Sequence, residues 1–175
     1  MIVPDGPGAP GRTAKPGERL PGRAVDPVAA DVRFAEGMIP HHRQALEMTA
    51  MVEARTTSAE IRTVAGNIAL TQQPEIKAMS DWLTGLGRAV PGGHSAHAPG
   101  AYGMASLEEL NRLRAARGEA FDRLFLELMI RHHQGAMKMA GEQLGAGRDL
   151  RMRLMAKDVY TGQGIEVARM RRLLG

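Results

Sequence analysis

The chain of 175 residues, 43% of them hydrophobic, is long enough for one ordinary domain with a core and too short for two large ones. The absence of cysteine excludes disulfides, zinc–thiolate sites and thiol nucleophiles. The net charge is +4, but basic and acidic residues are interspersed and aromatic residues make up only 3%, so no nucleic-acid partner is expected. Twelve methionines among few rings favour a core of packed helices.

The first 30 residues contain six of the ten prolines, with many glycines between them. Because this composition cannot form a core, residues 1–30 are predicted to be a flexible tether, and residues 31–175 the compact domain. Such a tether suits a protein whose signal peptide or membrane anchor lay upstream and was removed. No apolar run in the sequence approaches the roughly 20 residues that a membrane span requires.

Apolar residues at spacings of three and four predict two helices in the first half of the domain, at about residues 31–84. The first helix is expected to begin after Asp31 as its N-cap and to kink at Pro40. A polar break at residues 56–58 separates it from the second, which runs from about Ile61 to Leu83. The two helices form a predicted hairpin.

A linker and a short helix, at about residues 85–118, precede the second half. The linker is rich in Gly and Pro and holds His94 and His97, which are expected in a solvated loop, with an auxiliary metal site as the alternative. Ser106, followed three positions later by Glu109, predicts a capping box that opens a helix over residues 106–117. Two longer helices follow at about residues 119–144 and 149–174, separated by a Gly-Ala-Gly break.

The second half, at about residues 119–175, repeats the first half after a shift of 91 positions, without insertion or deletion over roughly fifty residues. The matched pairs include Phe34 with Phe125, Glu36 with Glu127, Met38 with Met129, His41 with His132, His42 with His133, Met48 with Met139, Gln72 with Gln163 and Glu75 with Glu166. The two hairpins are therefore predicted to pack about a pseudo-two-fold axis into an all-α four-helix bundle.

Each copy carries a methionine one turn before two adjacent histidines and another methionine two turns after the first of them. The candidate ligands are Met38, His41, His42 and Met48 in the first copy and Met129, His132, His133 and Met139 in the second. Thioether and imidazole groups on one helix face suit a soft ion, and Cu(I) in particular. Zinc or another transition metal is left open, through imidazole and the carboxylates of Glu75 and Glu166.

Structural alternatives exist for each of these residues. Methionines at helical spacing often only fill a core, and a buried histidine often serves as a hydrogen-bonding group. Gln72, Glu75, Gln163 and Glu166 are expected either to orient the imidazoles or to make bundle hydrogen bonds. Since adjacent histidines point about 100° apart on a helix, one of each pair is expected to face the bundle axis. If the helices that carry them face each other, both clusters form one shared site.

Several segments resemble domain-of-unknown-function family number 305, over about residues 31–174. They are Met38-Ile39-Pro40-His41-His42, Met129-Ile130-Arg131-His132-His133-Gln134-Gly135-Ala136, Gln73-Pro74-Glu75-Ile76 and Phe121-Asp122. The resemblance implies a ferritin-like four-helix bundle, export to the periplasm, cell surface or medium, and copper handling at the two His pairs and the nearby methionines. The central loop has fewer Met and His residues than the most copper-oriented members, and no dense Met-rich tail follows, which argues against high-capacity storage.

The sequence therefore predicts an exported protein that sequesters or passes on copper, more in keeping with a binding protein than with an enzyme. A ferritin-like di-metal oxidase is the first alternative, but its Glu-x-x-His pairing is missing, because Glu36 and Glu127 each lie five residues before a histidine. A metal-independent interaction module with the histidines as a pH-sensitive layer is the second. Association near a membrane and a homo-oligomer are left open.

Overall fold

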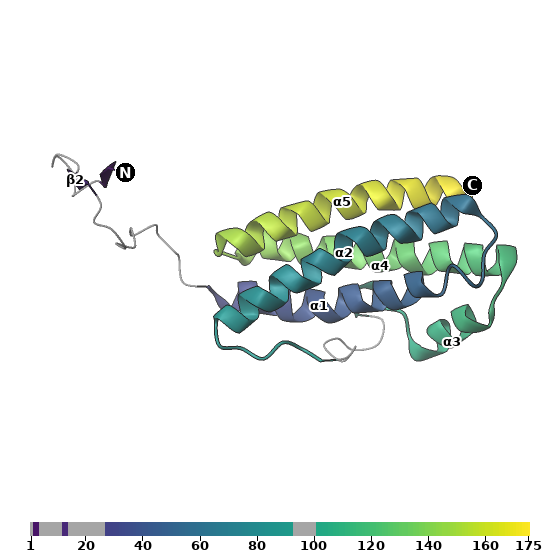
Figure 1. Ribbon diagram of the computed structural model, residues 1–175, viewed down its shortest axis with the longest axis horizontal. Coiled ribbons are helices and arrows are strands. Elements are labelled where there is room, and N and C mark those ends of the chain that lie inside the picture. The colour runs from purple at the N-terminus through teal and green to yellow at the C-terminus, as the bar shows by residue number, and fades with distance from the viewer. Residues whose placement is uncertain (1, 4–11, 14–26, 93–100) are drawn as a thin grey trace.

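In the computed structural model, which describes residues 2–3, 12–13, 27–92 and 101–175, four long helices form a bundle (Figure 1). They are α1 (Ala29–Ala50), α2 (Ala59–Gly85), α4 (Gly118–Ala146) and α5 (Leu150–Leu174). Between α2 and α4 lie the 3-10 helix η1 (Ala101–Gly103) and the short helix α3 (Leu107–Ala115). Near the N-terminus, β1 (Ile2–Val3) pairs with β2 (Arg12–Thr13) in an antiparallel manner.

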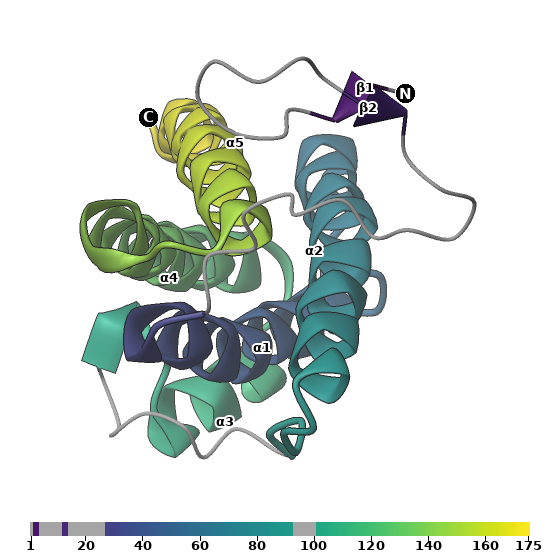
Figure 2. The ribbon, with the colours of Figure 1, turned by 90° about the vertical axis from the view of Figure 1, so that its left-hand side faces the viewer.

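The bundle consists of two helical hairpins, α1 with α2 and α4 with α5. The helices α1 and α4 run antiparallel along each other, and so do α2 and α5, while α3 lies outside the bundle beside α1 and α4 (Figures 1 and 2). The predicted all-α bundle of two hairpins is therefore confirmed. None of the helices in the described part of the chain has an apolar stretch long enough to cross a membrane.

Three helix starts are set by side chains that accept backbone N–H groups of the first turn. The Ser58 hydroxyl accepts from Ile61 at the start of α2, and the Asp149 carboxylate accepts from Met152 at the start of α5. The predicted capping box of α3 is present, since Ser106 accepts from the N–H of Glu109 and the Glu109 carboxylate accepts from the N–H of Ser106.

Some boundaries differ from the prediction. Asp31 is not the N-cap of α1, because the helix begins two residues earlier and Asp31 lies in its first turn, where its carboxylate accepts the N–H of Val28. The helix α1 runs through Pro40 as one element. The helix α3 ends at Ala115, two residues earlier than expected, and Gly118 opens α4 with a positive φ of 56°. His94 and His97 lie outside the described residues.

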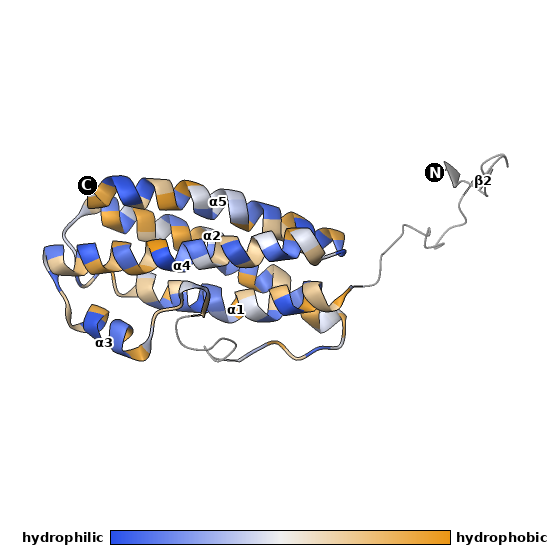
Figure 3. Ribbon diagram, turned by 180° about the vertical axis from the view of Figure 1, so that it is seen from behind, coloured by the Kyte–Doolittle hydropathy of each residue, from blue (hydrophilic) through white to orange (hydrophobic). Residues whose placement is uncertain are grey.

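The core consists of two clusters of buried apolar side chains, one toward each end of the bundle. Three methionines of one cluster are related by the shift of 91 positions to three methionines of the other cluster. They are Met38, Met79 and Met139 in one cluster and Met48, Met129 and Met170 in the other. Each long helix carries both hydrophilic and hydrophobic residues, as helices with one buried side do (Figure 3). The middle of the bundle, between the clusters, is occupied by polar side chains.

Candidate metal centre

The two predicted histidine clusters meet where α1 crosses α4. The rings of His41 and His132 lie with their centroids 3.7 Å apart and their planes tilted by 35°. Both side chains are fully buried. The two clusters therefore lie side by side and not on opposite sides of the bundle. One shared site requires this geometry.

The second histidine of each pair turns toward the other helix of its own hairpin. His42 Nε2 lies 2.7 Å from a carboxylate oxygen of Glu75 on α2, and His133 Nε2 lies 2.8 Å from that of Glu166 on α5. Because a carboxylate only accepts hydrogen bonds from these rings, Nε2 carries a proton in each ring, and whenever the imidazole is neutral its lone pair lies on Nδ1. Neither Nδ1 has a hydrogen-bond partner in the described part of the chain. One histidine of each pair thus faces the axis and the other the neighbouring helix, as expected.

His132 is the least satisfied of these buried groups. Both of its ring nitrogens lack a hydrogen-bond partner among the described residues. Burial of the ring holds its pKa well below the ordinary value, and the nearby His41, His133 and His42 act in the same direction. The ring is therefore neutral at physiological pH, and a neutral imidazole has a lone pair available to a metal ion.

The methionines named as candidate ligands are all buried. Met38 and Met139 lie in one core cluster, and Met48 and Met129 lie in the other. The pairs therefore combine one residue of α1 with one residue of α4 on each side of the histidine contact. This arrangement places thioether groups on both sides of the histidines, and the same side chains also fill the core. The structure therefore agrees with a role as metal ligands and with a role in packing.

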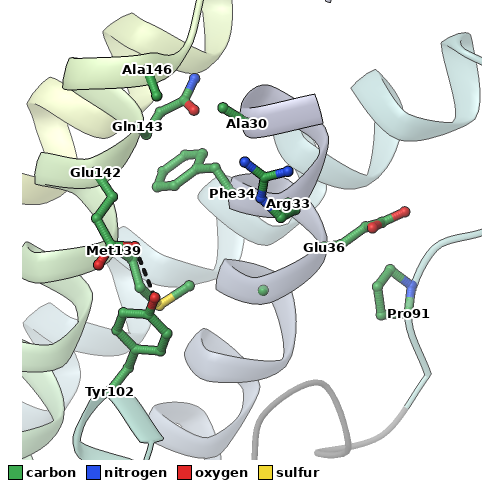
Figure 4. A pocket seen from close by; sticks show the side chains of 11 residues that line it. Ala30, Arg33, Phe34, Glu36, Pro91, Tyr102, Met139, Glu142, Gln143 and Ala146 are labelled. Carbon is green, nitrogen blue, oxygen red and sulfur yellow. Dashed lines mark hydrogen bonds between the residues drawn. The ribbon is translucent and has the colours of Figure 1, made fainter. Parts of the chain in front are cut away.

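A cleft of about 560 Å³ opens beside the histidine contact, between the first half of α1 and the second half of α4 (Figure 4). Phe34, Met139, Tyr102 and Glu142 line it, and the hydroxyl of Tyr102 donates a hydrogen bond to Glu142 at 2.8 Å. The backbone carbonyl of Tyr102 accepts a hydrogen bond from His41 Nε2 at 2.9 Å. Tyr102 thus lines the cleft and also contacts the buried His41.

The carboxylates do not assemble as a di-iron site requires. Glu36 pairs with Arg88 and Glu127 pairs with Arg123, in both cases near the surface. Over the described ranges, no three His, Asp or Glu side chains converge in the geometry of a preformed metal site. The donor set that the structure does bring together is imidazole and thioether, with Glu75 and Glu166 behind two of the imidazoles. Neutral nitrogen and sulfur donors fit a soft cation and not calcium or magnesium.

One feature of this region was not predicted from the sequence. The Tyr102 carbonyl was not expected near His41, and its one trace in the sequence is Gly135, which stands where the first copy has Gln44. Gln72 and Gln163 were expected either to orient the imidazoles or to make hydrogen bonds within the bundle. Both are buried, and neither amide has a hydrogen-bond partner among the residues described.

Fold and site together define a four-helix bundle protein with a buried layer of histidines between two methionine-containing clusters. Residues 31–174 match the sequence profile of the domain of unknown function DUF305. The chain belongs to the DUF305 family.

Solved structures of the family share this fold. A DUF305 fragment from Deinococcus radiodurans has a TM-score of 0.77 at 31% identity, over 85% of this chain and 97% of that chain. A DUF305 protein from Streptomyces coelicolor, provisionally described as secreted, has a TM-score of 0.76 at 30% identity, over 83% and 91%. CopM in its Cu(II)-bound form has a TM-score of 0.72 at 31% identity, over 82% and 95%, and CopM has also been solved with Cu(I) and with silver.

Protein L153 of Acanthamoeba polyphaga mimivirus is 38% identical over 53 residues. These residues make up 30% of this chain and 35% of the viral protein, so the match spans about a third of that relative.

Proposed function

We propose that this protein binds a soft metal ion, copper as Cu(I), at the buried histidine layer, and that it sequesters or passes on the ion without chemical conversion. The observation that carries the proposal is the set of buried ring nitrogens without hydrogen-bond partners in the described residues: Nδ1 of His42, Nδ1 of His133 and both nitrogens of His132. Buried polar atoms in folded proteins are nearly always satisfied, so an ion that accepts imidazole lone pairs accounts for them.

The residues divide into donors and supports. The proposed donors are His41, His42, His132 and His133, with the thioethers of Met38 and Met139 on one side of the histidines and those of Met48 and Met129 on the other. Glu75 and Glu166 hold the rings of His42 and His133 through Nε2 and so fix their tautomer and orientation. The silver- and copper-bound forms of CopM support a soft ion as the cargo.

The proposed place of action is outside the cytoplasm, at the cell surface, in the periplasm or in the medium. Two observations support it. The Pro- and Gly-rich residues 1–30 have the composition of a tether, and the Streptomyces coelicolor relative is provisionally described as secreted.

The test is an anaerobic titration of the metal-free protein with Cu(I) against a chromogenic chelator. The wild-type protein is compared with a variant that carries His41→Gln and His132→Gln, which keeps the central positions polar. We expect the variant to lose at least about 100-fold in affinity, because ligands contribute more than the outer residues whose loss costs about 10–100-fold. Circular dichroism confirms that the variant is folded.

The matched control carries His94→Gln and His97→Gln, two histidines of the central linker. It is expected to bind as the wild type does. Wild-type protein that fails to compete for Cu(I), or a central variant that binds as tightly as the wild type, would refute the proposal.

A further inference from the structure

Residues 101–105, which we call the strap, are fastened across α1 and α4 beside the histidine contact. The amide of Gln44 on α1 donates to the carbonyl of Ala105 at 2.9 Å and accepts from its N–H at 2.7 Å. At the other end, the Tyr102 hydroxyl donates to Glu142 on α4. Between these anchors, the Tyr102 carbonyl accepts the hydrogen bond of His41 Nε2. The strap is thus held on both sides of the atom that contacts His41.

The backbone of the strap has an uncommon conformation and approaches α4 very closely. Tyr102 has a positive φ of 49° and is followed by Gly103 with a φ of 71°. A Cβ placed on Gly135 of α4 would overlap the Tyr102 carbonyl, and a Cβ on Gly103 would overlap the carbonyl of Arg131. A non-glycine residue in the left-handed region persists only where its surroundings enforce it. Gly135 therefore creates the space into which the Tyr102 carbonyl fits.

The two copies of the repeat differ at this point. Gln44 in the first copy occupies the position that Gly135 occupies in the second, and the two residues act on opposite ends of the strap. Gln44 binds the strap through hydrogen bonds to Ala105, and Gly135 leaves room for the carbonyl of Tyr102. As a result His41 receives a carbonyl partner, whereas no nitrogen of its counterpart His132 has a hydrogen-bond partner in the described part of the chain.

We propose that the strap is a positioning element that fixes the tautomer of His41 and thereby makes the two central histidines chemically unequal. A backbone carbonyl only accepts hydrogen bonds, so the neutral ring of His41 carries its proton on Nε2 and its lone pair on Nδ1. Neither ring nitrogen of His132 makes such a hydrogen bond to the described residues of the strap. Gly135, Gln44 and Tyr102 are the positioning residues.

The inference rests on the proposed function, because a fixed tautomer matters to an ion that needs the lone pair in one direction. Groups that hold the second nitrogen of a metal-binding imidazole set its tautomer and orientation, and their loss weakens metal binding by about 10–100-fold. We expect the same weakening of metal binding when the strap is displaced. The side chains of residues 101–103 need not contact the ion for this effect.

The experiment uses Gly135→Ala, which displaces the Tyr102 carbonyl, and Gly141→Ala as its matched control. Gly141 lies on the same helix, and a Cβ there would meet no atom within 4 Å. The tautomer of His41 is measured by nitrogen-15 NMR on the metal-free protein at a pH where the rings are neutral. Cu(I) affinity is measured in parallel on both variants and on the wild type.

The wild type and Gly141→Ala are expected to show His41 with its proton only on Nε2, and Gly135→Ala to show a mixture of tautomers with Cu(I) affinity weakened by about 10–100-fold. If Gly135→Ala proves too unstable, Gln44→Ala releases the other end of the strap without a clash, with the same expectation. A wild-type His41 protonated on Nδ1, or variants that keep the wild-type tautomer, would overturn the inference. Because the tautomer is read without metal, failure of the wild type to bind copper would contradict the proposed function alone.

Discussion

At the residue scale, the carboxylate of Asp31 joins three parts of the bundle. One of its oxygens accepts from the Gln143 amide at 2.5 Å and from the N–H of Arg148 at 2.9 Å, and the other accepts from the N–H of Val28 at 2.8 Å. Burial alone would raise the pKa of Asp31, but the hydrogen bonds outweigh it and hold that pKa below its ordinary value. The charged carboxylate thus stabilises the contact between the start of α1 and the α4–α5 turn.

Asp31→Asn is expected to lower the free energy of unfolding by about 2 kcal/mol at neutral pH, because the charge is lost and an NH₂ group is placed against donors. Since the pKa of Asp31 is lower in the folded state, its contribution is complete above the unfolded value of about 3.9 and is lost as the pH falls through the folded value. The difference between wild type and variant should therefore shrink in acid. Urea unfolding at several pH values measures it.

The control for this prediction is Asp158→Asn, which changes an exposed carboxylate on α5. It should leave the free energy of unfolding within about 0.5 kcal/mol of the wild type. An equal loss in both variants, or a difference for Asp31 that stays constant as the pH falls, would contradict the assignment.

At the scale of elements, the helices could be predicted because their signals are local. Apolar spacing located the four long helices, and Ser106 with Glu109 located the start of α3. The start of α1 could not be predicted, because an acidic residue suits both the N-cap and the first turn. What decides its place is the contact of Asp31 with Gln143 and Arg148, more than 110 residues away in the chain.

The position of the strap could not be predicted from the sequence for the same reason, because its contacts are with distant residues. Tyr102 and His41 are separated by 61 residues, and a Gly/Pro-rich linker carries no periodic pattern that shows where it folds back. The glycine at position 135, in place of the Gln44 of the first copy, is a trace of the contact, but alone it indicates only that a backbone comes close.

The helix α3 is fastened to α4 by a bidentate ion pair between Glu109 and Arg131, at 2.6 and 2.7 Å. The Arg131 guanidinium, followed by the cap bonds of Ser106, lowers the pKa of Glu109 to about 2. The ion pair therefore stabilises the fold fully above about pH 4.5, and the contribution fades as the pH falls toward about 2. The same guanidinium donates to the carbonyl of Gly103, so the pair also supports the strap.

Glu109→Gln is expected to lower the free energy of unfolding by no more than about 1 kcal/mol at neutral pH, because both partners are partly exposed and water screens them. The variant keeps an amide oxygen for the N–H of Ser106, so the change isolates the ion pair. Unfolding at neutral and acidic pH measures it, with Glu108→Gln on the same turn as the control. A carboxyl titration by NMR that places the pKa of Glu109 near 4.5 would show the pair to be absent in solution.

At the scale of the whole molecule, the bundle is apolar at both ends and polar in its middle. The meeting of His41 with His132 could be anticipated, because both copies of the repeat keep the histidines and a two-fold arrangement brings equivalent positions of α1 and α4 together. Which ring nitrogens are satisfied could not be anticipated, because this depends on rotamers and on the approach of Glu75 and Glu166. The metal role of the eight candidate ligands stays a prediction.

The polar middle extends to α2 and α5 through Gln72 and Gln163. One core cluster joins Ile68 to Val167 and the other joins Met79 to Val159, so the two glutamines fall between the clusters on antiparallel helices. Their side chains are 1% and 4% exposed, and no amide atom has a hydrogen-bond partner among the described residues. A buried amide without partners destabilises the fold, by about 1–3 kcal/mol in mutational data.

The double variant Gln72→Met, Gln163→Met is therefore expected to unfold at higher temperature than the wild type, with a gain of about 1–2 kcal/mol for each site. Methionine has nearly the volume and flexibility of glutamine, so the gain reports the removal of the amides and not a change in packing. Gln73→Met, at an exposed position of α2, controls for the intrinsic effect of methionine on the helix. A double variant less stable than the wild type would mean that the amides are hydrogen-bonded in solution, and the polar middle would then stabilise the metal-free bundle instead of weakening it.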